Sequence, residues 1–408
     1  MKNFDIAIIG AGPSGSVAAA LLLQQGFSVC ILEKTTFPRF VIGESLLPYS
    51  MEVLKTANLA ETISQEKCFQ FKNGAAFSWG EQYTEFDFNE KFTPGAGTTF
   101  QVKRDKFDKI LIDEVARRGA QVLFNTEVIA FADSTEKATL KIRDSHGNTS
   151  DIQAKFVLDA SGYGRVLPRL LNLEKPSHLP VRSAKFTHID DNINDPDYDR
   201  NKILITTHPI LRDVWVWLIP FSDNRCSIGV VGLPQEIEGD AETVLKQTVK
   251  ACPMLNRILK NANWDNEVPF REIKGYSADV TALYGEKFAL LGNATEFLDP
   301  VFSSGVTIAL QSALLASNVV SKKLKGQEVN FEKDFAEKLM IGVNAFRTYV
   351  LGWYDHRFQD VIYASNQNED IRKMISAILA GYAWDLNNPM VTKSERRLNA
   401  LAEICRNQ

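Results

Sequence analysis

Residues 4–33 of the chain read FDIAIIGAGPSGSVAAALLLQQGFSVCILE, and this stretch decides the fold. Two apolar runs, Phe4–Ile9 and Ser28–Leu32, predict strands, and the apolar segment Ser16–Leu23 between them predicts a helix. A glycine turn joins the first strand to the helix. Glu33 ends the second strand, where an acid hydrogen-bonds a ribose. Strand, glycine turn, helix and strand in this order are the complete dinucleotide-binding fingerprint.

The residues of the turn each have a physical task. Gly10 permits the tight turn, Gly12 lets the backbone approach a pyrophosphate, and Gly15 lets helix and strand pack closely. The helix N-terminus faces the phosphates, because its N–H groups and dipole favour anions. We therefore expect the chain to bind a dinucleotide at its first turn.

Composition and charge exclude several classes of protein. The chain has 46 Lys and Arg residues and 50 Asp and Glu residues, which give a net charge of −4. It lacks the excess of basic residues that is typical of nucleic-acid-binding proteins. The five cysteines are scattered without metal-ligand spacing, which predicts reduced thiols and no metal. The sequence starts directly with a core strand, and no uninterrupted apolar run approaches the roughly 18 residues of a membrane span. We expect a cytoplasmic protein without an integral membrane segment.

In the rest of the chain, segments with a helical pattern alternate with segments with a strand pattern. Lys72–Phe100 and Ser183–Leu233 are strand-like, Lys103–Arg118 and Gly305–Leu324 are helical, and the chain from Asn330 onward is helical. This predicts an α/β fold, a Rossmann-like nucleotide-binding domain interrupted by a sheet-rich substrate domain and followed by a helical cap. The expected boundaries are 1–71, 101–182 and 270–326 for the first domain, 72–100 and 183–269 for the second, and 327–408 for the cap.

Two further glycine turns follow strands later in the chain. Asp159-Ala160-Ser161-Gly162 follows Phe156–Leu158, and Gly292-Asn293 follows Phe288–Leu291. Pro300 to Gly305 then leads into the second long helix, whose N-terminus can face an anionic group. Three such turns in this order resemble the para-hydroxybenzoate hydroxylase-like class of FAD enzymes, and the resemblance covers most of the chain.

The resemblance implies FAD as the cofactor. The class has Gly-Asp where this chain has Gly292-Asn293, and an Asn amide can still hydrogen-bond a ribityl hydroxyl. Arg104 matches the arginine of the class near the flavin phosphates and ribityl chain. The cofactor-binding residues that we expect are Gly10, Gly12, Pro13, Ser14, Gly15, Glu33, Lys34, Arg39, Ser45, Arg104, Val128, Ala160, Gly162, Gly292, Asn293, Pro300, Ser304, Gly305 and Val306.

Three finer signatures resemble one family on this scaffold, the flavin-dependent halogenases of the phenol and pyrrole type. They are Pro38-Arg39-Phe40 with Gly43-Glu44-Ser45-Leu46-Leu47-Pro48, the WxWxIP box Trp215–Pro220, and an FxxPxxSxG segment at Phe297–Gly305. The resemblance implies that reduced FAD from a separate flavin reductase, oxygen and chloride or bromide give hypohalous acid. This oxidant would halogenate a small electron-rich aromatic substrate, either free or bound to a carrier protein.

Trp215 and Trp217 would then keep the substrate from the flavin, whereas a strand in the substrate-domain core would bury the same alternating face. Backbone N–H groups around Ser303, Ser304 and Gly305 would hold the halide. An aromatic hydroxylase or monooxygenase, or a geranylgeranyl-reductase-like enzyme, are the alternatives on the same scaffold.

Lys72 lies where the halogenase family has the lysine that directs hypohalous acid. The opposing interpretation is a solvated lysine, because Asn73-Gly74 is a strong signal for a two-residue hairpin turn. Lys103 is the weaker candidate for the same role. Exposure of Lys72 therefore separates the two interpretations.

Overall fold

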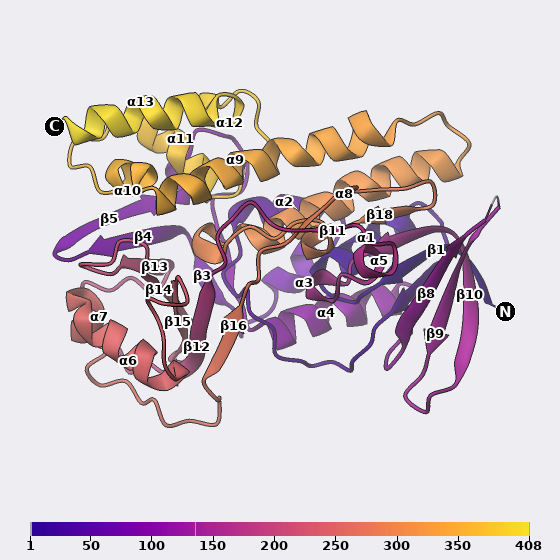
Figure 1. Ribbon diagram of the computed structural model, residues 1–408, viewed down its shortest axis with the longest axis horizontal. Helices are drawn as coiled ribbons and strands as arrows, with labels where there is room; N and C mark the ends of the chain where they lie inside the picture. Colours follow the sequence, from indigo (N-terminus) through magenta and orange to yellow (C-terminus); the bar gives the residue numbers. More distant parts are fainter. Residues whose placement is uncertain (1, 135, 408) are drawn as a thin grey trace.

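The computed structural model describes residues 2–134 and 136–407 of the chain. Two large sheets occupy opposite ends of an elongated molecule, and two long helices, α8 and α9, run along it between them (Figure 1). The N-terminus lies at the end of the first sheet, and the C-terminus lies above the second. This arrangement leaves the contact region between the two sheets as the place where residues from distant parts of the sequence meet.

The first sheet is the nucleotide-binding sheet, and its strand order is β7-β2-β1-β10-β9-β8, with β18 also pairing with β10. The pairs of β1 with β2 and β10, of β2 with β7 and of β10 with β18 are parallel. Both faces of such a sheet must be covered, which explains why β1 and β2 end in continuous buried apolar runs. Its strands are β1 Lys2–Ile9, β2 Val29–Leu32, β7 Gln121–Leu123, β8 Glu127–Asp133, β9 Ala138–Arg143, β10 Thr149–Asp159 and β18 Phe288–Leu290.

The helices around this sheet begin and end near the predicted residues. α1 spans Pro13–Gln24 and packs against α8, which spans Ser304–Leu324, while α4 spans Arg104–Arg117. Among the described residues, α8 is the one helix long and apolar enough to cross a membrane, but 72% of its apolar window is buried inside the protein. The other helices in this part are α2 Pro48–Thr56, α3 Ala60–Ser64 and α5 Val166–Leu170.

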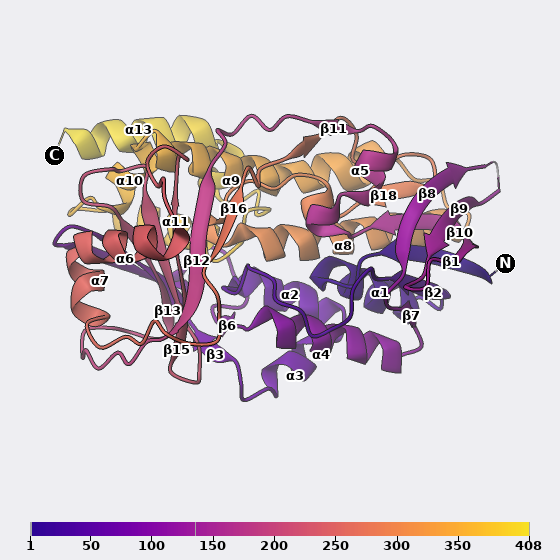
Figure 2. The ribbon, with the colours of Figure 1, turned by 60° about the horizontal axis from the view of Figure 1, so that its bottom comes forward.

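The second sheet has the order β16-β12-β15-β14-β13-β4-β5, and all its pairs except β13 with β4 are antiparallel. Its two faces belong to different cores. Trp215, Trp217 and Ile219 join the large core facing the first sheet, whereas Val216 and Leu218 pack beneath α6 and α7 on the outer side (Figures 1 and 2). The elements are β4 Gly74–Trp79, β5 Gln82–Asp87, β12 Ser183–Asp190, β13 Lys202–Thr207, β14 Trp215–Pro220, β15 Arg225–Gly232, β16 Arg271–Lys274, α6 Ala241–Ala251 and α7 Pro253–Ile258.

The C-terminal part is helical, as predicted, and its helices lie over one end of the second sheet (Figure 2). α9 carries the buried aromatic residues Phe346, Tyr349 and Trp353, which fix it to the large core. We propose the domain boundaries given above on the basis of these elements. The helices are α9 Glu337–Tyr354, α10 Arg357–Ile362, α11 Glu369–Leu379, α12 Pro389–Thr392 and α13 Ser394–Arg406, and a π-helical turn, η5 Glu332–Ala336, precedes α9.

The hairpin predicted at Asn73-Gly74 is wrong. These residues connect two sheets: β3 (Gln70–Lys72) pairs with β6 (Thr99–Gln101), while β4 pairs with β5 and β13. A Cβ at Gly74 would lie 2.3 Å from the carbonyl oxygen of Phe86, so close strand packing explains this glycine. The local turn signal was misleading because the chain leaves one sheet and enters another here.

Candidate functional site

The first glycine turn contains two glycines that the fold itself requires and one that it does not. Gly10 has a φ of +98°, and a Cβ there would lie 2.5 Å from the carbonyl oxygen of Ala160. A Cβ at Gly15 would lie 2.1 Å from the carbonyl oxygen of Gly10. A Cβ at Gly12 would meet only the Arg39 guanidinium, at 3.8 Å. The protein has room for a side chain at Gly12, so this glycine keeps space for something outside the chain.

Glu33 lies directly beside this turn. One carboxylate oxygen accepts a hydrogen bond from the Ala11 N–H at 2.9 Å, and the other accepts from the N–H and hydroxyl of Thr35. The predicted ribose-binding acid is therefore held at the turn. Lys34 is exposed and pairs with Glu127, and Val128 is buried in β8.

The second and third glycine turns lie next to the first. The buried Asp159 carboxylate accepts from the Ser161 and Leu167 N–H groups, and burial raises its pKa. A Cβ at Gly292 would lie 3.6 Å from the Ser14 hydroxyl, so the third turn reaches the N-terminus of α1. The structure brings these predicted segments together at one edge of the first sheet.

The side chain of Arg165 joins the second turn to the third, and the sequence analysis missed this residue. Its guanidinium donates to the Asn293 carbonyl at 3.3 Å and to Glu174 at 2.9 Å. Its backbone is left-handed, with a φ of +45°. A non-glycine residue in that conformation is uncommon and needs support from its surroundings, which the hydrogen bonds provide.

Arg104 and Arg39 are the cations of this region. Arg104 is buried, forms two hydrogen bonds with the Asp108 carboxylate at 2.7 and 3.0 Å, and donates to the Ile42 and Gly43 carbonyls. Arg39 lies 3.9 Å from Asp108 and is partly exposed. Arg104 therefore holds the Gly43-Glu44-Ser45 segment in place, and Arg39 is the freer cation beside Gly12.

Lys72 lies in the core and is not solvated. Its side chain is 0% exposed, and its ammonium donates to the Ser45 hydroxyl at 2.7 Å and to the Leu46 carbonyl at 2.8 Å. The pKa of Lys72 falls to about 7, because burial penalises the charged form and both partners are neutral. Lys103, the weaker candidate, instead pairs with Asp223 at 2.5 Å. The interpretation of Lys72 as an exposed turn residue is wrong.

Burial of Lys72 predicts a pH-dependent penalty on stability. Below pH 7 this lysine is protonated in both the folded and unfolded states, so the folded protein bears the full cost of a buried charge. Between pH 7 and 10.5 only the unfolded chain holds the proton, so the penalty shrinks as pH rises. We expect Lys72→Met to stabilise the protein more at pH 6 than at pH 9, by about 3 kcal/mol from this pKa shift. Urea unfolding at both values measures this, and a pH-independent difference would contradict the shift.

Several buried polar atoms near Lys72 have no hydrogen-bond partner among the described residues. They include Glu44 Oε2, Thr99 Oγ1 and both polar atoms of the Gln101 side chain. Ser45 pairs with Gln101, and Thr99 lies opposite Lys72 in the β3–β6 register. An unpartnered buried polar group costs about 1–3 kcal/mol, and these groups keep free hydrogen-bonding capacity that a bound ligand or water can use. The sequence analysis missed Gln101, which ends the short strand Thr99–Gln101 three residues before Arg104.

The two tryptophans of the WxWxIP box form part of one buried wall. Trp215 and Trp217 lie on the same face of β14, 6.0 Å apart between ring centroids. Trp217 donates to the Ser227 hydroxyl at 3.1 Å, and its ring lies against Gly229, where a Cβ would be 2.3 Å away. Both tryptophans therefore have fixed orientations, as either a barrier or a core strand requires.

The segment before α8 forms a tight turn. The Asp299 carboxylate accepts from the Val301 N–H at 3.1 Å, and Ser303 has a left-handed φ of +55°. The Ser303 N–H donates to the Pro300 carbonyl at 2.9 Å. Of the three predicted anion-binding positions, Ser304 and Gly305 therefore retain N–H groups that a helix N-terminus leaves free for an anion. Val306 follows in the first turn of α8 and is buried.

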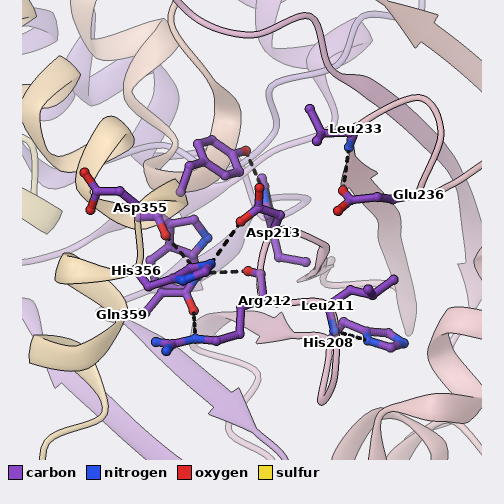
Figure 3. A network of polar contacts seen from close by, with 12 residues as sticks. His208, Leu211, Arg212, Asp213, Leu233, Glu236, Asp355, His356 and Gln359 are labelled. Atoms are coloured by element: carbon purple, nitrogen blue, oxygen red, sulfur yellow. Dashed lines mark hydrogen bonds and ion pairs between the residues drawn. The ribbon is translucent and has the colours of Figure 1, made fainter.

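The histidines of the second sheet stabilise local structure. His188 forms a 2.7 Å hydrogen bond with Glu44, which ties β12 to the Gly43-Glu44-Ser45 segment. His208 accepts from the Ile210 and Leu211 N–H groups in the loop before β14 (Figure 3). His178 lies outside both clusters, in the irregular segment before β12.

Comparison with known proteins identifies the class. A family model described as an FAD binding domain matches residues 3–330, so the chain belongs to this family of FAD-binding proteins. The three adjacent glycine turns and the unpartnered groups of Glu44, Thr99 and Gln101 fit FAD, which offers phosphates, hydroxyls and ring carbonyls as partners.

Relatives narrow the assignment within that family. The chain is 29% identical to the 1H-pyrrole-2-carbonyl-(peptidyl-carrier protein) chlorinase of Pseudomonas fluorescens, over 98% of this chain and 94% of that protein. It superimposes on the myxobacterial chondrochloren halogenase CndH with a TM-score of 0.75 and 26% identity, covering 99% and 97% of the two chains. A flavoprotein/dehydrogenase from Cytophaga hutchinsonii matches with a TM-score of 0.95 and 42% identity, covering 99% of each chain. The sequence and structural relatives together place this chain among the flavin-dependent halogenases.

Proposed function

We propose that this enzyme uses FADH2, oxygen and chloride or bromide to halogenate a small electron-rich aromatic ring, with Lys72 delivering the halogen. The observation that carries the proposal is the burial of Lys72, with neutral partners, beside the segment that Arg104 holds. Burying an ammonium costs free energy, so a lysine without a role in this region would lie at the surface. The halogenase relatives support the reaction class.

FAD, when bound, supplies the redox chemistry that converts oxygen and halide into hypohalous acid. We propose that the three glycine turns, Glu33 and Arg39 hold its nucleotide part, and that Arg104, Ser45 and Gln101 lie along the rest. The N–H groups of Ser304 and Gly305, at the N-terminus of a 21-residue helix, are the proposed halide site.

Lys72 has a simple chemical task in this proposal. Its ammonium donates a hydrogen bond to the oxygen of hypohalous acid, which makes that oxygen a better leaving group. A ring carbon of the substrate takes the halogen as the bond between halogen and oxygen breaks, and the leaving oxygen takes a proton from the Lys72 ammonium and departs as water. The ring carbon then loses its own proton, which returns to the Lys72 amine or passes to solvent, so that ArH and HOX give ArX and water. Ser45 and the Leu46 carbonyl fix the ammonium in one position, which orients this transfer.

Trp215 and Trp217 are proposed to separate substrate from flavin. Their fixed indole rings belong to a buried face with Phe186 and Ile219, and this face offers few polar groups to a ligand. Such a wall favours a neutral aromatic substrate. The pyrrole-2-carbonyl carrier-protein chlorinase among the relatives supports a pyrrole or phenol ring, either free or carrier-bound. A separate flavin reductase and a cytoplasmic location remain predictions.

The test is turnover of the purified protein with FAD, a flavin reductase, NADH, oxygen and either chloride or bromide. Mass spectrometry reads out a panel of phenols and pyrroles, including a pyrrole thioester, and taurine present as a trap reports escaping hypohalous acid as its haloamine. Halide-dependent product or haloamine supports the proposal. A hydroxylated product, or reduction of substrate without halide or oxygen, would instead show a monooxygenase or a dehydrogenase-like enzyme.

A further inference from the structure

Tyr354, the last residue of α9, forms hydrogen bonds to two segments that are distant in the sequence. Its hydroxyl accepts from the Trp215 indole N–H at 3.0 Å and donates to Asp299 Oδ2 at 2.9 Å. Trp215 begins the strand of the WxWxIP box, and Asp299 precedes the turn into α8. The end of α9 thus contacts both the aromatic wall and the proposed halide-binding turn through a single atom, the Tyr354 hydroxyl oxygen.

Asp299 transmits this contact to the turn. Its Oδ2 also accepts from the Tyr276 hydroxyl at 3.0 Å, and its Oδ1 accepts from the Val301 N–H. Two residues further on, Ser303 has the left-handed backbone that a non-glycine residue rarely adopts. The surrounding contacts must hold such a turn, because the backbone alone does not favour it. Asp299, fixed by two tyrosine hydroxyls, is the polar group best placed to do so.

Tyr354 is itself held on its ring face and through the loop before β14. The Arg182 guanidinium lies 3.2 Å from the centroid of the Tyr354 ring, and Arg182 contacts Asp213 at 3.5 Å. Asp213 in turn faces His356 at 3.0 Å, as the close-up shows (Figure 3). These contacts hold the loop before β14 against residues 355–356, which connect α9 to α10.

A neighbouring residue of the same loop, Arg212, forms further hydrogen bonds to α10. Arg212 donates to the Gln359 side chain at 3.1 Å, and the Gln359 amide donates back to the Arg212 carbonyl at 2.9 Å (Figure 3). Arg212 also donates to the Asp360 carboxylate at 2.7 Å. Residues 355–360 and the loop before β14 therefore form one hydrogen-bonded unit. Tyr354 directly precedes this unit and also reaches Asp299.

We propose that Tyr354 is a positioning residue that couples the tryptophan wall to the turn at the start of α8. It acts through Trp215 and Asp299 and contacts neither substrate nor halide. This inference rests on the proposed function, in which that turn holds the halide and the wall guides the oxidant. Without the coupling, halide binding would weaken, less hypohalous acid would form per oxygen consumed, and less halogen would reach the substrate.

The test is Tyr354→Phe, which removes one hydroxyl and both its hydrogen bonds while the ring remains. Tyr349→Phe is the matched control: Tyr349 lies on the same helix, is buried, and donates its hydroxyl to the Met390 carbonyl at 2.6 Å, in the cap. We expect the two holoenzymes to bind FAD equally. In Tyr354→Phe the halogenated product per oxygen consumed should fall at least tenfold and the KM for halide should rise at least fivefold.

A second readout needs no turnover. Halide titration of the oxidised holoenzyme, followed through the flavin absorbance spectrum, should give a weaker halide Kd in Tyr354→Phe than in Tyr349→Phe. Equal halide Kd, halide KM and product per oxygen in the two variants would overturn the coupling. Absence of halide response and of halogenated product already in the unmodified enzyme would instead overturn the proposed function, together with the coupling built on it.

Discussion

Replacing Lys72 with Met is expected to reduce halogenated product at least 100-fold while FAD binding and oxygen consumption stay close to those of the unmodified enzyme. A positioned proton donor contributes typically 10²- to 10⁴-fold to rate. Among the described residues, Lys72 is the lysine that hydrogen-bonds to Ser45 and Leu46. Methionine retains the length and apolar body of the side chain without the ammonium. Product formation, oxygen uptake and haloamine escape are measured on the same preparation.

Lys185 provides the matched control for that experiment. It is a second buried lysine, which lies in β12 and pairs with Glu272 at 2.9 Å, on the far face of the sheet from the tryptophans. Lys185→Met should destabilise the protein, because it leaves the Glu272 carboxylate without this partner. Product per bound FAD should remain unchanged. Equal loss of product in both variants would show that Lys72 serves the fold and not the chemistry.

The second large effect is expected at the first glycine turn, where substitution of one glycine should weaken FAD binding and substitution of another should prevent folding. Gly12→Ala should lower FAD affinity at least tenfold and leave the melting temperature of the FAD-free protein within about 2 °C, because a Cβ there meets no atom of the chain closer than 3.8 Å. Gly10→Ala should prevent folding or lower the melting temperature strongly, since its Cβ would overlap the Ala160 carbonyl and its φ is +98°. Isothermal titration with FAD and thermal unfolding of the FAD-free protein separate the two effects.

Gly26→Ala is the control for the backbone conformation alone. Gly26 has a φ of +82°, and a Cβ there meets no atom within 4 Å. Its substitution should cost about 1 kcal/mol of stability through the left-handed backbone and leave FAD affinity unchanged. If Gly12→Ala binds FAD as tightly as Gly26→Ala does, the assignment of the first turn to the pyrophosphate is wrong.

The sequence by itself determined the nucleotide-binding half of the molecule. The fingerprint at residues 4–33 specifies local geometry, because a glycine turn between a strand and a helix can be recognised from neighbouring residues alone. Three helices, Pro13–Gln24, Arg104–Arg117 and Ser304–Leu324, lie close to their predicted bounds, and the alternating face of the WxWxIP box was also predicted correctly. Apolar periodicity reports which side of an element is buried.

Only the tertiary structure decided the environment of Lys72. Its burial arises from Ser45 and Leu46, which lie 27 and 26 residues away in the sequence, and the Asn73-Gly74 signal beside it predicted the opposite. The unpartnered Gln101 and the Tyr354 hydroxyl between Trp215 and Asp299 likewise depend on contacts across the fold. Local sequence encodes turns and periodic faces, whereas the hydrogen-bond partners of a buried polar side chain exist only after distant segments have packed together.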